Sequence, residues 1–379
     1  MISESIQKLD NWIEKNGWEG YDPYDGLKSY LKNITFNKYL RTALVQANKR
    51  SPVNIRPILG IKKGINPKGM ALFASAYLNL YKKTNNQNYK IKAEHCLNYL
   101  EKNQNRKYHG SSWGYNFDWE NRIFFLPAYE PSIVVTSVAA QGFIDSYEIT
   151  KNKNHIRIAR SACDFVIKDL NSEEDEKTLV YSYTPYDKSQ IYNANMFAAR
   201  LFSNVYKHTK EEILIEKARK IINHTMMHQR SDGAWTYGGN KKEKSILNKH
   251  SSRRIDNFHT GFVLDSMYHY LNSKDEKEVR KSFEKGLKFY KKNHFEKNIP
   301  KFTDKSLYPI DIHSCAQGII SFSLINEKKA AKKIAEFTIK EMQDKKGYFH
   351  YQKTRLWKNK TPMIRWGQAW MLYALSKVS

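Results

Sequence analysis

The sequence predicts an all-α fold, an (α/α)6 six-hairpin toroid that forms a single domain over residues 1–379. Six times along the chain, a helix rich in small residues is expected just after a loop that carries aromatic, histidine or arginine side chains. Successive starts are about 64, 62, 65, 54 and 52 residues apart, a degenerate repeat that indicates an array of like units. The expected inner helices begin at Pro67, Pro131, Asn193, Phe258, Ile312 and Ile364.

Longer amphipathic stretches separate these inner helices. In each stretch apolar residues recur at helical spacing and Lys and Glu take the opposite side, which predicts a helix with one covered face. The inner helices are apolar nearly all round, which predicts burial. We expect residues 36–49 to form the first outer helix and residues 1–33 to be an N-terminal extension that packs on the ring. The other outer helices are expected over 89–102, 155–170, 211–229, 277–293 and 327–343.

The chain is strongly basic, with a formal net charge of +26 from 64 Lys and Arg against 38 Asp and Glu. Such a field attracts anionic partners and raises their encounter rate. Anionic lipid and acidic polysaccharide both qualify, and a solvated lysine-rich surface explains the charge equally well. Nucleic acid is an unlikely partner, because the sequence contains no recognised nucleic-acid-binding module.

Three cysteines, Cys96, Cys163 and Cys315, lie far apart, each within an expected helix. An odd and sparse set argues against a disulfide framework and suits a reducing compartment. The N-terminus has no secretory signal, and no apolar run is long enough to cross a bilayer. We therefore expect a cytoplasmic protein, whose oligomeric state the sequence leaves open.

Short aromatic strings precede the inner helices, so their side chains are expected at the end of the ring where the inner helices begin. Helix N-termini present unpaired backbone N–H groups and the positive end of the helix dipole, which suit a carboxylate, sulfate or phosphate. The six loops together predict a binding site at this end.

One motif resembles the Gln-x3-Gly-x-Trp repeat of the squalene cyclase and prenyltransferase-like toroids. It reads Gln229 to Trp235, recurs from Gln343 to Phe349 with Phe in place of Trp, and recurs in a stretched form from Gln104 to Trp113. In that family the repeat is structural and ties an outer helix to the next turn. The resemblance implies the fold and no substrate, and the Asp-x-Asp-Asp motif of the cyclases is absent.

The second half resembles the C-terminal toroid of D-glucuronyl C5-epimerases. Asn257-Phe-His259-Thr260 is similar to that family's Asp-Tyr-His-Thr, with Asn in place of Asp, and Tyr181-Ser-Tyr183 and Gly367-Gln-Ala369 are also similar. The segment 17–26 resembles uncharacterised toroid proteins associated with surface-polysaccharide gene clusters. These resemblances imply a uronic acid as substrate and a role in polysaccharide biosynthesis.

Sugar binding needs flat aromatic faces and a few polar groups that orient hydroxyls. Arginine can bind a uronate carboxylate through two parallel hydrogen bonds. These aromatics can instead tie adjacent repeats together, and the arginines can pair with loop carboxylates such as Asp256 or Asp311. The expected substrate-binding residues are Trp113, Tyr115, Trp235, Tyr237, Arg254, Trp357, Arg365, Trp366 and Arg56.

Four residues are candidates for proton transfer: His259, His313, Tyr183 and Tyr351. An arginine that neutralises a uronate carboxylate makes the C5 proton removable by such a base, which leads to epimerisation or to elimination of the 4-oxygen. The sequence therefore predicts a uronate C5-epimerase or lyase. A glycoside hydrolase with two carboxylates across the bond, or a non-catalytic toroid that binds a polysaccharide or a protein, remains the alternative.

We expect no cofactor and no metal. Asp311, His313 and Cys315 are suitable ligand types, but helical geometry places them poorly around one tetrahedral ion. The sequence contains neither a phosphate-binding glycine loop nor a dinucleotide-binding fingerprint.

Overall fold

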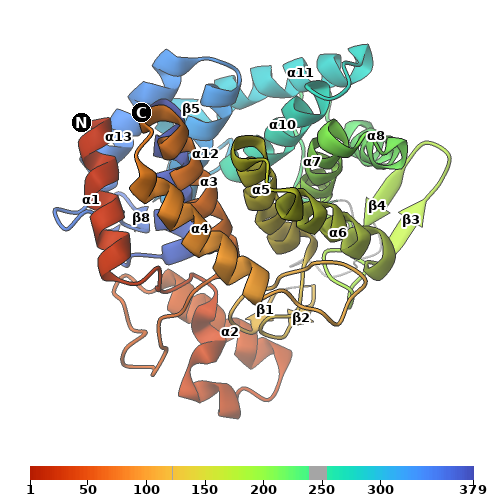
Figure 1. Cartoon of the computed structure of the whole chain (residues 1–379). Helices are drawn as coiled ribbons and strands as arrows, with labels where there is room; N and C mark the ends of the chain where they lie inside the picture. Colours follow the sequence, from red (N-terminus) through yellow and green to blue (C-terminus); the bar gives the residue numbers. More distant parts are fainter. Residues whose placement is uncertain (122, 239–253) are drawn as a thin grey trace. The chain divides into compact units, whose positions relative to one another are not determined.

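The computed structural model describes residues 1–121, 123–238 and 254–379, and their regular structure is mostly helical (Figure 1). The chain divides into two compact units. Unit 1 comprises Met1–Asn103, Trp113–Glu130 and Tyr308–Ser379, and unit 2 comprises Gln104–Ser112 and Pro131–Leu307. The single domain expected over residues 1–379 stays a prediction.

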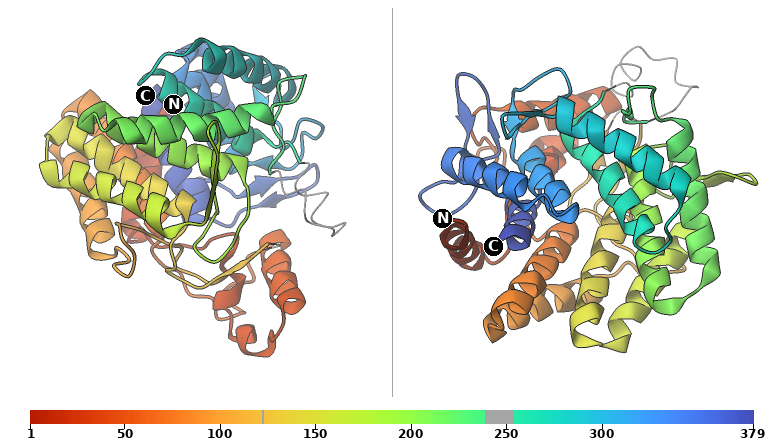
Figure 2. Two further views of the ribbon diagram at one scale, coloured as in Figure 1. Left: turned by 90° about the vertical axis from the view of Figure 1, so that its right-hand side faces the viewer. Right: turned by 90° about the horizontal axis from the view of Figure 1, so that it is seen from above.

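Unit 1 brings the two ends of the chain together, with the N- and C-termini close to each other beside α13 (Figure 2). Its helices and strands are α1 (Ile2–Lys15), η1 (Asp25–Lys28), η2 (Tyr30–Ile34), α2 (Lys38–Arg50), α3 (Pro67–Thr84), α4 (Gln87–Lys102), β1 (Trp119–Glu120), β2 (Phe125–Leu126), β7 (Ile310–Asp311), α12 (Ile312–Leu324), α13 (Lys328–Met342), β8 (Gln352–Lys353), β9 (Lys358–Asn359), the π-helical turn η3 (Ile364–Ala369) and α14 (Trp370–Val378).

Unit 2 repeats one arrangement, in which an inner helix packs on the outer helix that follows it. Short antiparallel hairpins connect some of these helices, and β3 pairs with β4 from Ser172 opposite Tyr181 to Glu174 opposite Leu179. Its elements are α5 (Ile133–Thr150), α6 (Lys153–Asp169), β3 (Ser172–Glu174), β4 (Leu179–Tyr181), α7 (Tyr192–Thr209), α8 (Glu212–Met227), α10 (Asn257–Leu271), α11 (Lys277–Asn293), β5 (Phe295–Glu296) and β6 (Ile299–Pro300).

The expected inner helices are present, and each begins within two residues of the predicted start. They are buried on nearly every side, because their small and apolar residues have no polar face to turn to water. Four of them begin at a capping side chain that accepts a hydrogen bond from the first turn, which ends the preceding loop at a defined residue. These capping residues are Asn66, Ser132, Asp256 and Asp311.

The Gln-x3-Gly-x-Trp motif works as a staple between outer helices. The Gln229 side-chain amide donates to the carbonyls of Gly233 and Ser282, both at 3.0 Å, and Ser282 lies on the next outer helix, α11. Gly233 has φ +98°, and a Cβ there would lie 2.5 Å from the Lys285 carbonyl. Glycine is required at this position both by the backbone angle and by the closeness of α11.

The copy at Gln343 corrects the expected role of the N-terminus. Gln343 donates to the carbonyls of Gly347 and Ser5, and a Cβ on Gly347 would lie 2.2 Å from the Lys8 carbonyl. Ser5 and Lys8 on α1 thus take the places that Ser282 and Lys285 hold on α11. Helix α1 also packs on α13 and α14, so within the described chain it is an outer helix rather than an added extension.

Helix α2 was expected to be the first outer helix, and it is present over Lys38–Arg50. It packs mainly on η1 and β1 rather than on the inner helix α3 (Figure 1). Because α1 already takes the outer position, α2 is an additional element of unit 1.

No described helix combines the length and apolar character needed to span a membrane. Cys96, Cys163 and Cys315 are unbridged and buried within α4, α6 and α12, as the spacing predicts.

Candidate functional site

A histidine–aspartate pair stands at the start of the inner helix α10 in unit 2. Asp256 caps this helix: its Oδ1 accepts from the His259 backbone N–H at 3.0 Å, and its Oδ2 lies 2.8 Å from His259 Nδ1. The Asp256 side chain is 2% exposed, whereas that of His259 is 24% exposed. The cap therefore fixes the imidazole and leaves part of it open to the outside.

Electrostatics fix the protonation of this pair. Burial raises the pKa of Asp256, but the charge and hydrogen bonds of His259, together with the charge of Arg254, outweigh burial and lower that pKa to about 2. An ionised carboxylate can only accept, so His259 Nδ1 carries a proton and donates it to Asp256. The other ring nitrogen, Nε2, is then the one that can take a proton from a substrate.

Arg254 and Tyr237 complete the surroundings of the pair. Arg254 Nε lies 3.1 Å from Asp256 Oδ2, and its guanidinium covers the Phe302 ring at 4.6 Å. The Arg254 side chain is 40% exposed. The Tyr237 ring lies 4.7 Å from the His259 ring, and the Tyr237 N–H donates to the Arg254 carbonyl at 3.1 Å. We call Tyr237, Arg254, Asp256 and His259 the His259 cluster.

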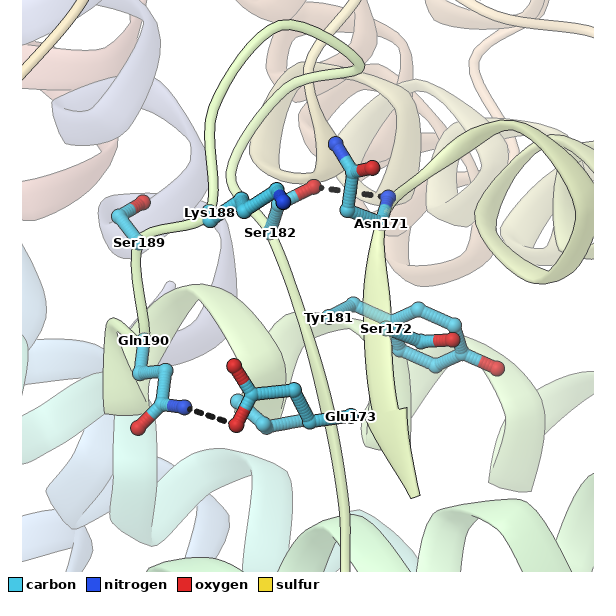
Figure 3. Close-up of a pocket in the computed structure, with 9 residues that line it drawn as sticks. Asn171, Ser172, Glu173, Tyr181, Ser182, Lys188, Ser189 and Gln190 are labelled. Carbon is cyan, nitrogen blue, oxygen red and sulfur yellow. Dashed lines mark hydrogen bonds between the residues drawn. The ribbon is translucent and has the colours of Figure 1, made fainter.

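Unit 2 also has a polar hollow of about 180 Å³, whose lining residues come from the β3–β4 hairpin and the 188–190 loop (Figure 3). The Gln190 amide donates to Glu173 at 2.9 Å, and Ser182 Oγ accepts from the Asn171 N–H at 3.0 Å. Such a lining of hydroxyls, amides and one opposite charge pair suits a ligand that carries several hydroxyl groups. The hollow is lined by Asn171, Ser172, Glu173, Val180, Tyr181, Ser182, Lys188, Ser189 and Gln190.

Backbone pairing connects the hollow to the His259 cluster. Ile191, which follows Gln190, forms an antiparallel bridge with Gly238, which follows Tyr237. The side chain of Asp187 stiffens the same wall by accepting from the backbone N–H groups of Thr184 and Ser189, each at 2.7 Å. The backbone that forms this wall of the hollow is therefore paired with the segment that carries Tyr237.

Tyr183, one of the predicted proton-transfer residues, lies in the loop before α7, next to a residue that lines the hollow. It follows Ser182, is 6% exposed, and its carbonyl accepts from the Ile133 N–H at 3.0 Å. Its backbone holds the loop to the start of α5.

The two predicted arginines of unit 1 are bound to internal carboxylates. Arg365 forms two hydrogen bonds with Asp22, at 2.6 and 2.7 Å, and Arg56 forms two with Asp25, at 2.9 and 3.1 Å. All four side chains are buried. The pairing that the sequence left open is thus what the structure has, although the partners are Asp22 and Asp25 rather than Asp256 and Asp311.

The guanidinium of Arg365 packs against aromatic rings. Its guanidinium lies 4.8 Å from the Tyr115 ring and 5.3 Å from the Trp366 ring. Tyr115 and Trp366 are both under 9% exposed. These three predicted binding residues are brought together, as a packed cluster inside unit 1.

His313 and Tyr351 are also inside unit 1, and each is 1% exposed. The His313 ring lies 4.3 Å from Trp366 and 4.9 Å from Trp370. Burial, and then the nearby Asp311 charge, raises the pKa of Tyr351 well above its usual value, which makes this phenol a poor base. Because both side chains are almost fully buried, neither is placed to receive a proton from a substrate at the surface.

Trp113 and Trp235 are buried, and each forms a hydrogen bond to the backbone of a preceding helix. They are 1% and 3% exposed, and their indole N–H groups donate to the carbonyls of Leu100 at 2.8 Å and Thr225 at 3.0 Å. A face buried in this way cannot stack on a sugar, so we leave both out of the site. Trp357, on the turn between β8 and β9 in unit 1, is 39% exposed.

Sequence reasoning missed Asp256 as the partner of His259 and missed the hollow entirely. The signal for Asp256 was local, because an aspartate just before a predicted helix and three residues from a histidine is a typical N-cap. The carboxylate partners Asp22 and Asp25 lie in the 17–26 segment, which was noted only for its resemblance to other toroids.

Among the described residues, no group of three or more His, Cys, Asp or Glu side chains is arranged to hold a metal ion. No family model matches the chain, and no curated protein is significantly similar to it.

Solved structures do resemble it. Cellobiose 2-epimerase from Bacillus thermoamylovorans is 12% identical over 83% of this chain and 87% of that one, with a TM-score of 0.62. The Lin0763 protein from Listeria innocua is 15% identical over 100% and 97%, with a TM-score of 0.64. The GH76 α-mannanase BT2949 from Bacteroides thetaiotaomicron is 13% identical over 82% and 85%, with a TM-score of 0.59. At these identities the likeness shows the fold, which is the all-α toroid predicted from the repeat.

Proposed function

We propose that the chain is an enzyme that acts on a saccharide by removing a proton from a carbon next to a carbonyl group, with His259 as the base. The observation that carries the proposal is the pairing of His259 Nδ1 with the buried Asp256, which leaves Nε2 on a partly exposed ring. A base oriented by a carboxylate is the arrangement that general base catalysis needs.

The finer proposal is a uronic acid, with reaction at C5. His259 Nε2 takes the C5 proton, and the electron pair of that C–H bond moves toward the carboxylate to form an enediolate. The exposed part of Arg254 binds this carboxylate and stabilises the added charge. Delivery of a proton from water to the other face of C5 gives the epimer, after which His259 releases its proton to solvent, whereas transfer of the His259 proton to the departing 4-oxygen gives an unsaturated uronide.

Several other predicted residues do not enter this step. His313 and Tyr351 are buried, and Arg56 and Arg365 are already bound to carboxylates. Tyr237 packs on the imidazole, so it would supply a wall of the substrate site.

The hollow supports a substrate longer than one sugar. Its wall pairs with the segment that carries Tyr237, and its hydroxyl and amide lining would offer hydrogen-bond partners to a further sugar residue.

An aldose substrate is a second candidate, which the fold neighbours favour. A 2-epimerase and a D-mannose isomerase are among the structures with this fold, and the C2 proton of an aldose also lies next to a carbonyl group. The same His259 base serves that reaction, whereas the carboxylate-binding role of Arg254 does not.

A glycoside hydrolase is less well supported, because the candidate carboxylates are occupied. Asp256 binds His259 and Arg254, and Asp311 accepts from Gln352 and Trp366. Asp118 pairs with Lys32, and Glu120 with Arg41. A hydrolase needs one carboxylic acid and one carboxylate placed across the bond.

The test is incubation in heavy water with heparosan, alginate and pectin fragments and with an aldose disaccharide. Deuterium at a uronate C5 supports the epimerase, and absorbance of an unsaturated uronide supports the lyase. Deuterium at C2 of the aldose supports the second candidate. New reducing ends without deuterium would indicate a hydrolase, and no change in any arm would indicate a binding protein.

A further inference from the structure

The N-terminal part of unit 1 has an exposed surface that combines apolar side chains with basic ones. Six large apolar side chains between residues 30 and 58 are 60–83% exposed, in a chain whose other apolar side chains are mostly buried. Clustered exposure of this kind marks an interaction site, whereas single exposed apolar residues do not. We define the 30–58 surface by Tyr30, Ile34, Phe36, Tyr39, Val53 and Ile58.

Three short segments carry these side chains, and two of the segments are in contact. The Tyr30 N–H donates to the Leu59 carbonyl at 3.3 Å, so η2 lies on the 53–60 loop, and Tyr30 packs over Gly60. Asn37 ends this stretch by capping α2, which carries Tyr39. Because α2 is not part of the repeating helix pairs, the packing of the toroid does not explain its exposed apolar face.

The chain segment that carries this surface is basic, and two of its cations, Lys32 and Arg41, pair with Asp118 and Glu120. Residues 26–63 contain nine Lys and Arg and no Asp or Glu. The C-terminal segment 345–379 is also free of acidic residues, and it meets the same region where the Asn359 amide donates to the Ser51 carbonyl at 2.8 Å. Basic side chains such as Lys38, Arg50, Lys62 and Lys63 are exposed here.

We propose that the 30–58 surface binds the surface of an anionic membrane. Aromatic residues favour the boundary between lipid headgroups and acyl chains, and lysine and arginine favour anionic headgroups. Aliphatic side chains such as Ile34, Val53 and Ile58 gain by burial in acyl chains, whereas an acidic polysaccharide or a nucleic acid offers them nothing to bury against. This combination therefore favours lipid over the other anionic partners.

Membrane binding is independent of the reaction proposed at His259, because it uses other residues in the other unit. It would hold the enzyme at a surface where membrane-attached saccharides are present.

The experiment is co-sedimentation of the full chain with vesicles of one part phosphatidylglycerol and three parts phosphatidylcholine, compared with pure phosphatidylcholine. We expect binding to the anionic vesicles to be at least about tenfold stronger and to weaken as salt rises. Two double variants test the apolar and the electrostatic contributions to membrane binding separately. Phe36→Ser with Tyr39→Ser removes aromatic side chains, and Arg50→Glu with Lys62→Glu reverses two charges. Each should lower the partition coefficient by about tenfold.

The matched controls change similar exposed side chains elsewhere. Ile213→Ser with Met227→Ser removes exposed apolar groups from α8, and Lys281→Glu with Lys288→Glu reverses two exposed charges on α11. Both controls should bind vesicles like the unchanged chain, and circular dichroism checks that all variants are folded.

Three results would overturn the proposal. The first is equal binding to neutral and anionic vesicles, or no binding to either kind of vesicle. The second is binding to soluble heparosan with no binding to vesicles. The third is self-association that the Phe36 and Tyr39 changes abolish in a chain that does not sediment with lipid.

Discussion

At the scale of single residues, the Asp256 carboxylate decides what His259 can do. It caps α10, holds Nδ1 and stays ionised at neutral pH because its pKa is near 2. Asp256→Asn keeps the size and the cap but removes the charge that fixes the imidazole. We expect the rate of deuterium incorporation to fall by about 10²- to 10⁴-fold while the melting temperature changes little. An unchanged rate would mean that the pair is only structural.

A substitution at Arg254 distinguishes the two candidate substrates, a uronate and an aldose. Arg254→Gln removes the cation that would bind a carboxylate, so KM for uronates should rise by at least about tenfold while aldose turnover is unaffected. The control is Arg230→Gln, because Arg230 is a similarly exposed arginine of unit 2 paired with Asp232. Equal effects on both substrates would remove the carboxylate-binding role.

A buried histidine gives the stability of the fold a defined pH dependence. Burial lowers the pKa of His294 to about 4, below its ordinary value of 6.5. Between these two pH values His294 is protonated in the unfolded chain but neutral in the folded chain. The free energy of unfolding therefore decreases as the pH falls from about 6.5 to about 4. The expected loss from this residue is about 3 kcal/mol.

Urea unfolding at several pH values measures this effect. His294→Gln should flatten the dependence between pH 6.5 and 4, and the exposed His109→Gln should leave it unchanged. The flattening is partial, because burial and His228 also lower the pKa of His224 to about 4. A slope that His294→Gln leaves unaltered would contradict the explanation.

At the scale of helices and strands, local patterns predicted most of what the structure contains. The inner helices begin where a capping residue meets a run of small residues, and both signals lie within a few positions of each other. The role of α1 could not be found in this way, because the staple that reveals it joins Gln343 to Ser5, which are 338 residues apart. The same limit hid the Asp22–Arg365 pair, whose members are 343 residues apart.

For the candidate site, too, residues close together in the sequence could be predicted, whereas contacts with the next repeat could not. His259 and Arg254 were predicted from their place before an inner helix, and Tyr237 lies close to them along the chain. For Trp113 and Trp235 the sequence left a binding role and a structural role open, because an aromatic before a helix has the same sequence signature whether it faces outward or donates into its own repeat. The orientation of each ring depends on the next repeat, which no local pattern describes.

The close packing of Gly347 against α1 predicts how much stability a substitution at this glycine removes. Gly347→Ala forces a side chain into a backbone at φ +101° and against the Lys8 carbonyl, so the chain should lose about 3 kcal/mol of stability. Gly233→Ala, in the copy that binds α11, should cost about as much. Gly17→Ala is the control, because Gly17 also has positive φ but has no atom near its added Cβ, and about 1 kcal/mol is expected there. Equal small losses at all three glycines would contradict the staple.

At the scale of the whole molecule, the excess of positive charge is unevenly distributed along the sequence. The two acid-free segments, 26–93 and 345–379, both belong to unit 1. The His259 cluster and the hollow belong to unit 2. Both units nevertheless carry a net positive charge, so the charge of unit 2 remains available to an acidic substrate and the acid-free segments of unit 1 are available to a second partner.

The most direct test of the proposed function is the rate of deuterium incorporation into saccharide carbons by the unchanged chain, His259→Gln and His109→Gln. His109 is the matched control, because its Nδ1 also binds a carboxylate, Asp169, at 2.6 Å in the same unit. We predict exchange by the unchanged chain and by His109→Gln, and a loss of at least about 10²-fold in His259→Gln. Exchange that survives His259→Gln, or that both variants lose equally, would contradict His259 as the base.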